Sequence, residues 1–154
     1  MAGQDQARVR AMTLKTAIAE SKAKGDYAVL LAAIPYLRFL GLQAREGPNG
    51  ILCILPPDMK FVGNPLLPAL HGGVVGALME AAAIVQLLWA SEVTHVPKII
   101  DLSIDYLRPA RLVETSAQAV VTRHGRRVAN VRVGAWQGDA SRPVAAAHAH
   151  FLLA

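Results

Sequence analysis

Glu80 is the residue whose surroundings point most directly to chemistry. It interrupts an apolar run that extends over Val74–Ala90. A carboxylate buried alone costs several kcal/mol or stays protonated, so it needs a partner, water or a catalytic role. Gly73 and Gly76 precede it by seven and four positions and share its face of a helix. The missing side chains predict space for a substrate beside the carboxylate. A helix face that reaches solvent and close helix packing are the structural alternatives.

The tripeptide His71-Gly72-Gly73 stands at the start of the same apolar run. The first N–H groups of a helix lack internal acceptors and lie at the positive end of its dipole. Glycines let a ligand approach those amides closely, and a polarised carbonyl oxygen is a suitable ligand. The pattern indicates an oxyanion hole, in which N–H donors stabilise negative charge on a reacting oxygen. A tight turn before the helix, with His71 packed or capping it, is the structural alternative.

Distance along the helix separates the two halves of this candidate site. Gly73 and Glu80 are seven residues apart, which is roughly 10 Å at ~1.5 Å per residue. His71 lies roughly 13 Å from Glu80 and on the opposite face. A carboxylate or its water must lie about 3 Å from the carbon that it attacks. One chain can therefore hardly bring Glu80 and the glycine amides to the same carbonyl group. Two antiparallel helices from different chains could place the Glu80 of one chain opposite the glycines of the other, so we expect two composite sites in a symmetric dimer.

The residues before this site predict a helical extension. Residues 4–24 have the pattern of a polar-faced helix, and Tyr27–Ile34 that of a short helix that Pro35 ends. We therefore expect an N-terminal helical extension at 1–34 and a second, larger unit at 35–154.

The larger unit is expected to be α+β, with an antiparallel sheet around one helix. The expected strands are Leu37–Arg45, Ile51–Leu55, Ile99–Leu107, Glu114–Arg123, Arg126–Gln137 and Val144–Leu153. Four prolines within residues 56–70 predict irregular structure there. Short connections favour antiparallel pairing. The run at 72–90 is long enough for a helix, and because it is apolar almost all round, a curved sheet should cover it.

Length and composition limit the class of protein. The 154 residues are 53% hydrophobic and 18% charged, which suits one folded domain and excludes global disorder. Aromatic residues make up 5%, which argues against a base-stacking nucleic-acid platform. The net charge of +5 is modest and fits a small anionic ligand or solubility.

Location is predicted from cysteine usage and from apolar segments. The single Cys53 favours a reducing compartment, and the first twenty residues lack the apolar core of a secretory signal. The longest apolar run is short for a membrane span and contains Glu80 and Gln86. We therefore expect a cytoplasmic protein that does not associate with a membrane.

Two segments carry a combined pattern that goes beyond one tripeptide. Residues 64–80 read Asn-Pro-Leu-Leu-Pro-Ala-Leu-His-Gly-Gly-Val-Val-Gly-Ala-Leu-Met-Glu, and residues 101–110 read Asp-Leu-Ser-Ile-Asp-Tyr-Leu-Arg-Pro-Ala. Together with Gly125-Arg126-Arg127 and the last strands, they resemble the hotdog-fold acyl-CoA thioesterases, and more narrowly the phenylacetic-acid-degradation branch. The resemblance covers about residues 35–154. It implies a sheet wrapped round a central helix, in homodimers or homotetramers.

The resemblance also implies a reaction and the residues that perform it. The family hydrolyses an acyl- or aryl-acyl-CoA thioester to the free acid and CoA. By resemblance, Glu80 acts as general base or nucleophile, and the Gly73 amide, with Gly72 adjacent, forms the oxyanion hole. His71 and Asn64 would orient the thioester or the water. No metal or separate cofactor is implied, since coenzyme A is part of the substrate. An apolar pocket is expected to raise the pKa of Glu80.

The phosphates of coenzyme A call for cationic partners. Arginine binds phosphate through bidentate, charge-assisted bonds, and Arg108, Arg126 and Arg127 are the candidates. An ordinary solvated edge is the structural alternative, and an acidic acyl-carrier protein is the alternative partner. No nucleic-acid motif accompanies the basic residues, so we expect no nucleic-acid partner.

Two other functions remain open from the sequence. A non-catalytic acyl-CoA-binding sensor could keep the fold, although the retained Glu80 and His-Gly-Gly motif speak against it. A hotdog enoyl-CoA hydratase or dehydratase pairs the helix acid with an upstream histidine, and residues 1–70 contain no histidine.

Overall fold

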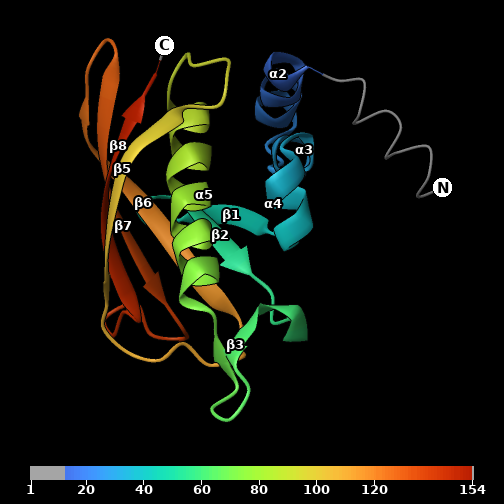
Figure 1. The fold of residues 1–154 in the computed structure, drawn as a ribbon. Coiled ribbons are helices and arrows are strands. Elements are labelled where there is room, and N and C mark those ends of the chain that lie inside the picture. The colour runs from blue at the N-terminus through green and yellow to red at the C-terminus, as the bar shows by residue number, and fades with distance from the viewer. Residues whose placement is uncertain (1–12, 154) are drawn as a thin grey trace, which may run out of the picture.

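The computed structural model describes residues 13–153 and shows a curved sheet around one long helix (Figure 1). The sheet consists of β1 (Gln43–Gly47), β2 (Gly50–Leu55), β5 (Lys98–Tyr106), β6 (Thr115–His124), β7 (Val128–Trp136) and β8 (Ala145–Leu152). Its strands lie in the order β1-β2-β6-β7-β8-β5, and every neighbouring pair is antiparallel. The predicted α+β fold class is therefore confirmed.

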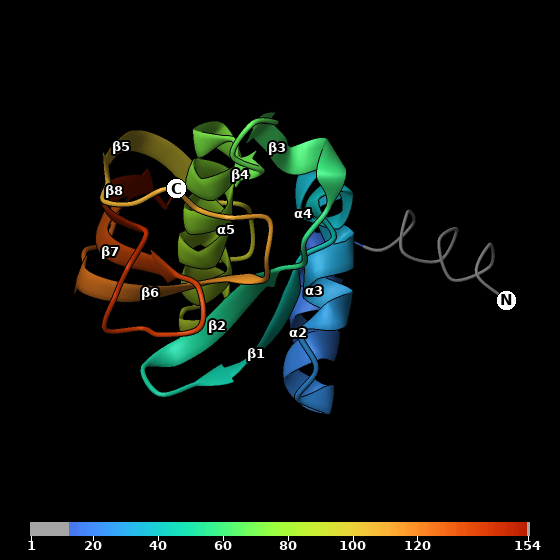
Figure 2. The same cartoon turned by 90° about the horizontal axis from the view of Figure 1, so that it is seen from below.

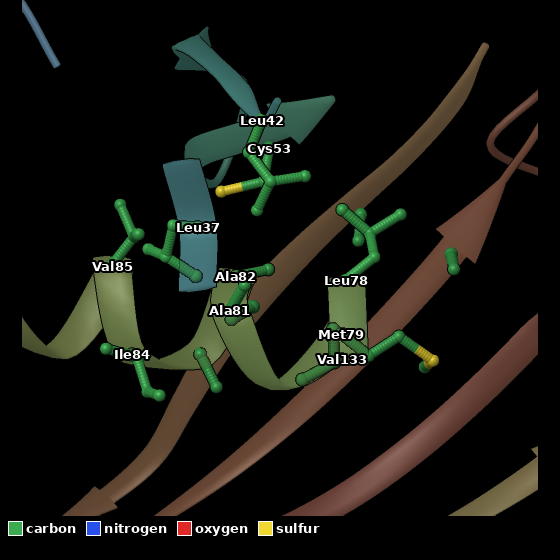
Figure 3. Packing of buried hydrophobic residues seen from close by; sticks show 14 of the residues in the cluster. Leu37, Leu42, Cys53, Leu78, Met79, Ala81, Ala82, Ile84, Val85 and Val133 are labelled. Carbon is green, nitrogen blue, oxygen red and sulfur yellow. The ribbon is translucent and has the colours of Figure 1, made fainter. Parts of the chain in front are cut away.

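The long helix is α5 (Gly72–Ala90), at the bounds that its apolar run predicts. The sheet curves around one side of it, and the N-terminal helices lie on the other (Figure 2). In Figure 3, Met79 and Val133 of β7 lie on one side of α5, while Leu37 of α4 and Cys53 of β2 lie on the other, so buried side chains surround the helix. Within the described residues, α5 alone has the length and hydropathy of a membrane span, and 61% of that window is buried inside the structure. Such burial is typical of a core helix.

The predicted N-terminal helices are confirmed where the structure describes them. Helix α2 (Leu14–Lys24) begins after its cap Thr13 and ends at Gly25, whose φ of 64° favours glycine. Helix α3 (Ala28–Ala33) lies within the predicted segment. Residues 4–12 of the first predicted helix lie outside the described residues.

A third short helix, α4 (Pro35–Leu40), replaces the start of the strand predicted at Leu37–Arg45. Pro35 ends α3 as expected, but it also occupies the first turn of α4, where its missing N–H costs nothing. Gly41, with φ at 66°, ends α4, and only then does the chain enter β1. The predicted strand was therefore wrong over its first half.

Short regular elements occupy part of the segment expected to be irregular. They are the 3-10 turn η1 (Met59–Phe61) and the paired strands β3 (Val62–Asn64) and β4 (Ala69–Leu70). Pro65 and Pro68 lie between β3 and β4, so the residues that pair keep their N–H groups. β4 ends directly before His71 and so delivers the chain to the start of α5.

Candidate active site

His71 is the N-cap of α5, as one of the sequence alternatives predicts. Its backbone is extended, with φ at −61° and ψ at 132°, and its N–H donates to Phe61 O at 2.8 Å. Its side chain turns back onto the helix, where Nδ1 accepts from Gly73 N at 2.9 Å. The cap satisfies one N–H that the first helical turn would otherwise leave without an acceptor.

This cap engages the amide that the sequence assigns to the oxyanion hole. Since Nδ1 accepts a hydrogen bond, a neutral His71 ring carries its proton on Nε2, and the exposed ring can present that proton as a donor. A substrate oxygen that binds Gly73 N–H must replace Nδ1. Gly72 N–H has no acceptor among residues 13–153 and lies one position earlier on the same turn.

Tyr106 joins this helix terminus to the sheet, which sequence reasoning did not foresee. Its hydroxyl donates to Gly72 O at 2.8 Å. Tyr106, Arg108 and Gly72 also line a cavity of about 320 Å³ beside the start of α5. The only sequence signal was the place of Tyr106 within residues 101–110, because the contact depends on how β5 packs on α5.

Glu80 lies half-buried on α5, on the stripe that Gly73 and Ala77 also share. Burial raises the pKa of its carboxyl group. No hydrogen bond or ion pair from the rest of the described chain reaches this carboxylate. Because α5 is one continuous helix, Gly73 and Glu80 remain about 10 Å apart along its axis. In the folded chain, too, Glu80 and Gly73 are too far apart to act on one carbonyl group.

Asn64 lies close to the helix terminus but is turned away into its own loop. It ends β3 and pairs with Ala69, two positions before His71. Its side-chain oxygen accepts a hydrogen bond from Leu66 N at 3.0 Å, which closes a turn within the loop. This oxygen is the acceptor that would otherwise be available to orient a ligand.

The three candidate arginines do not come together within one chain. Arg108 follows β5 and lies at the Gly72 end of the sheet. Arg126 and Arg127 lie in the turn before β7, where Arg127 O accepts from Leu153 N. That turn is at the other end of β5, roughly 26 Å away at ~3.3 Å per residue.

Within residues 13–153, no group of three or more His, Cys, Asp or Glu side chains lies close enough together to hold a metal ion. The buried Cys53 thiol has its pKa raised to about 12 by desolvation, which does not favour a thiolate nucleophile.

The sequence matches the model of a known protein family. Residues 67–144, which include the start of α5, Glu80 and Tyr106, match the model of the thioesterase superfamily. The chain belongs to this superfamily. The predicted resemblance to hotdog-fold thioesterases is thereby confirmed at the level of the superfamily. No curated protein matches the chain.

Solved structures of similar proteins agree with this assignment. A protein from Chromobacterium violaceum is 43% identical, with a TM-score of 0.70 over 89% of this chain and 96% of that one. A phenylacetic acid degradation-related protein from Ralstonia eutropha is 24% identical, with a TM-score of 0.68 over 77% of this chain and 90% of its own. A Bacillus halodurans protein solved with CoA is 21% identical, with a TM-score of 0.66 over 92% and 91% of the two chains. The latter two share the fold.

Proposed function

We propose that the protein is an acyl-CoA thioesterase that hydrolyses acyl- or aryl-acyl-CoA to the free acid and CoA. The observation that carries the proposal is the half-buried Glu80, which has no partner among residues 13–153 and lies on the same helix as the glycine amides, in a member of the thioesterase superfamily. A carboxylate with a raised pKa in such a place is suited to proton transfer or nucleophilic attack. The glycine N–H groups supply the complementary donors.

The proposed site is completed by a second copy of the chain. Glu80 and Gly73 lie about 10 Å apart in one helix, so an antiparallel α5 from the second copy would place its Glu80 opposite this Gly73. The edge strand β5 exposes apolar Ile99 and Ile100, which a second copy could cover. We propose a homodimer, or a tetramer built from such dimers, with two active sites per dimer.

In the reaction, Glu80 takes a proton from water, and the resulting hydroxide attacks the thioester carbon. The carbonyl oxygen becomes an oxyanion, which the Gly72 and Gly73 N–H groups of the other chain stabilise after His71 releases Gly73. The intermediate then collapses, the C–S bond breaks, and CoA leaves as the thiolate. A thiolate needs less help to leave than an amine, so no further acid is required. Direct attack by the Glu80 carboxylate is the variant with a covalent anhydride intermediate.

The antiparallel arrangement also brings the arginines into one region. Arg108 stands at the Gly72 end of its own chain, and Arg126 and Arg127 stand at the other end. In a dimer of antiparallel helices, the Arg126–Arg127 turn of one chain lies toward the Gly72 end of the other. We propose that these side chains bind the phosphates of coenzyme A, which enters as part of the substrate.

A thiol-release assay over short, long and aromatic acyl-CoAs tests the proposal. We expect at least one class to be hydrolysed by the wild type, and Glu80→Ala to lose that activity. Equal and negligible rates for both proteins on every substrate would contradict the proposal. Loss of enoyl-CoA absorbance without thiol release would indicate hydration instead.

A further inference from the structure

The Tyr106 hydroxyl connects the end of β5 to the first turn of α5 through its 2.8 Å hydrogen bond to Gly72 O. Its ring also lies against glycines of the helix. A Cβ atom added at Gly72 would meet ring carbons at 3.3 Å, and one added at Gly76 would lie 3.6 Å from the hydroxyl oxygen. Gly72 therefore leaves the room that the Tyr106 ring occupies on α5, while Gly76 is in ordinary contact with its hydroxyl. The contact uses a carbonyl and leaves the N–H groups of the turn available.

Peptide geometry carries this contact to the neighbouring amide. The Gly72 carbonyl and the Gly73 N–H belong to one planar unit in which they point in opposite directions. A bond that holds the carbonyl therefore sets the direction of the N–H. Gly72 and Gly73 are the first two residues of α5, so the helix also orients this peptide, and the Tyr106 bond adds to that constraint where the residues lack side chains. In the structure, Tyr106 holds the carbonyl end, while His71 Nδ1, at 2.9 Å, accepts from the N–H end.

We propose that Tyr106 is a positioning residue for the oxyanion hole, acting through the Gly72–Gly73 peptide rather than by touching the substrate. The inference rests on the proposed function, in which Gly73 N–H is an oxyanion donor. The hydroxyl keeps this N–H directed outward when a substrate oxygen replaces His71 Nδ1. It also polarises the peptide, since a hydrogen bond to a carbonyl strengthens the N–H of the same unit as a donor. Both effects grow as charge develops on the oxygen, so they act on the transition state more than on binding.

Tyr106→Phe removes the hydroxyl and keeps the ring against the glycines. We expect kcat to fall about tenfold, as for the loss of one hydrogen bond, with KM changed less than about twofold. Tyr36→Phe, an exposed tyrosine of α4, is the matched control and should leave both constants unchanged. A rise in KM with kcat unchanged would mean that the hydroxyl binds substrate directly, and no change in either constant would mean that it has no role. Either result overturns the proposal.

A measurement on Gly73 itself separates this inference from the proposed function. The protein has 12 glycines, so labelling with ¹⁵N-glycine gives a spectrum in which the Gly73 signal can be assigned by its loss in Gly73→Ala. We expect Tyr106→Phe to move the Gly73 nitrogen signal upfield and to speed its exchange with solvent, while Tyr36→Phe leaves it in place. If the signal responds but the wild type hydrolyses no thioester, only the proposed function fails. If the signal does not respond, the positioning role fails whatever the activity.

Discussion

Glu80 is half-buried on α5, and burial raises the pKa of its carboxyl group. Replacing it with glutamine keeps its shape and removes both its charge and its basicity. We expect Glu80→Gln to lower kcat by about 10²–10⁴-fold, the usual contribution of a general base. Thiol release under substrate saturation measures this loss. Activity within a factor of a few of the wild type would exclude Glu80 from the reaction.

The same pKa shift predicts how Glu80 affects stability. A carboxyl group whose pKa is higher in the folded than in the unfolded state contributes stability only while it is protonated, and that contribution is lost as pH rises through the folded pKa. At pH 7 the wild type therefore carries the cost of a buried charge, which Glu80→Gln avoids. Denaturant unfolding should show the variant to be the more stable protein at pH 7, by a margin that shrinks toward pH 4. Glu92→Gln, at an exposed position, is the control and should show no such margin. A variant that is less stable at pH 7 would contradict this account.

The pH dependence of catalysis should report the ionisation of the Glu80 carboxyl group. If the carboxylate must be ionised to act, kcat/KM rises with pH along an acid limb whose midpoint reports its pKa in the free enzyme. Since burial raises that pKa, we expect the midpoint to lie above about 4.3, the ordinary value for glutamate. A pH profile of thiol release checks this. A limb centred at or below the ordinary value would show that the reacting carboxylate is not desolvated.

At the scale of elements, the β3–β4 hairpin places His71 through a close backbone contact. A Cβ atom at Gly63 in β3 would lie 2.7 Å from His71 Cα, which is backbone and cannot turn aside. We expect Gly63→Ala to lower the free energy of unfolding by about 1–3 kcal/mol, the usual range for overpacking, and to reduce kcat by displacing the cap of α5. Chemical denaturation and thiol release measure the two effects.

Gly134 in β7 offers a matched control for this prediction. A Cβ atom there would meet nothing within 4 Å, and its backbone needs no positive φ. Gly134→Ala should therefore change neither stability nor kcat appreciably. If Gly63→Ala behaved like Gly134→Ala, the hairpin would not determine where His71 lies.

Elements with a clear pattern in their own residues could be predicted from the sequence, and short elements that depend on neighbouring segments could not. The bounds of α5 follow from its own apolar run and the glycines at its start, and the strand runs after residue 97 were also predicted within a few residues. Helix α4 was missed because Pro35 both ends one helix and starts the next. β3 and β4 were missed because their pairing depends on the hairpin rather than on either short segment.

Within the candidate site, too, some features could be predicted from the sequence and others could not. Glu80 and the glycine amides were predicted because their spacing lies within one helix. The His71 cap is also local, and the sequence offered it as one alternative. The bond between Tyr106 and Gly72 spans 34 residues and does not follow from a pattern of residue types, because it depends on how β5 packs on α5.

At the scale of the whole molecule, the proposed active site is shared between two chains. The distance of about 10 Å between Gly73 and Glu80 along α5 supports this proposal, and the separation of Arg108 from Arg126 and Arg127 fits it. A site shared in this way has a property that a site within one chain lacks. Two chains that are each inactive for a different reason can restore activity to one another.

Mixed dimers test this claim most directly. One chain carries Glu80→Gln, and the other carries Gly73→Pro, which removes the N–H at a first-turn position where proline is tolerated. Each variant alone should be inactive while retaining its helical content by circular dichroism. When the two are co-expressed in equal amounts, random pairing makes about half of the dimers mixed. One of the two sites in each mixed dimer combines an intact Glu80 with an intact Gly73 from different chains, while the other site carries both substitutions, so about a quarter of the total wild-type activity should return. Activity that stays at the level of the separate variants would contradict the two-chain site.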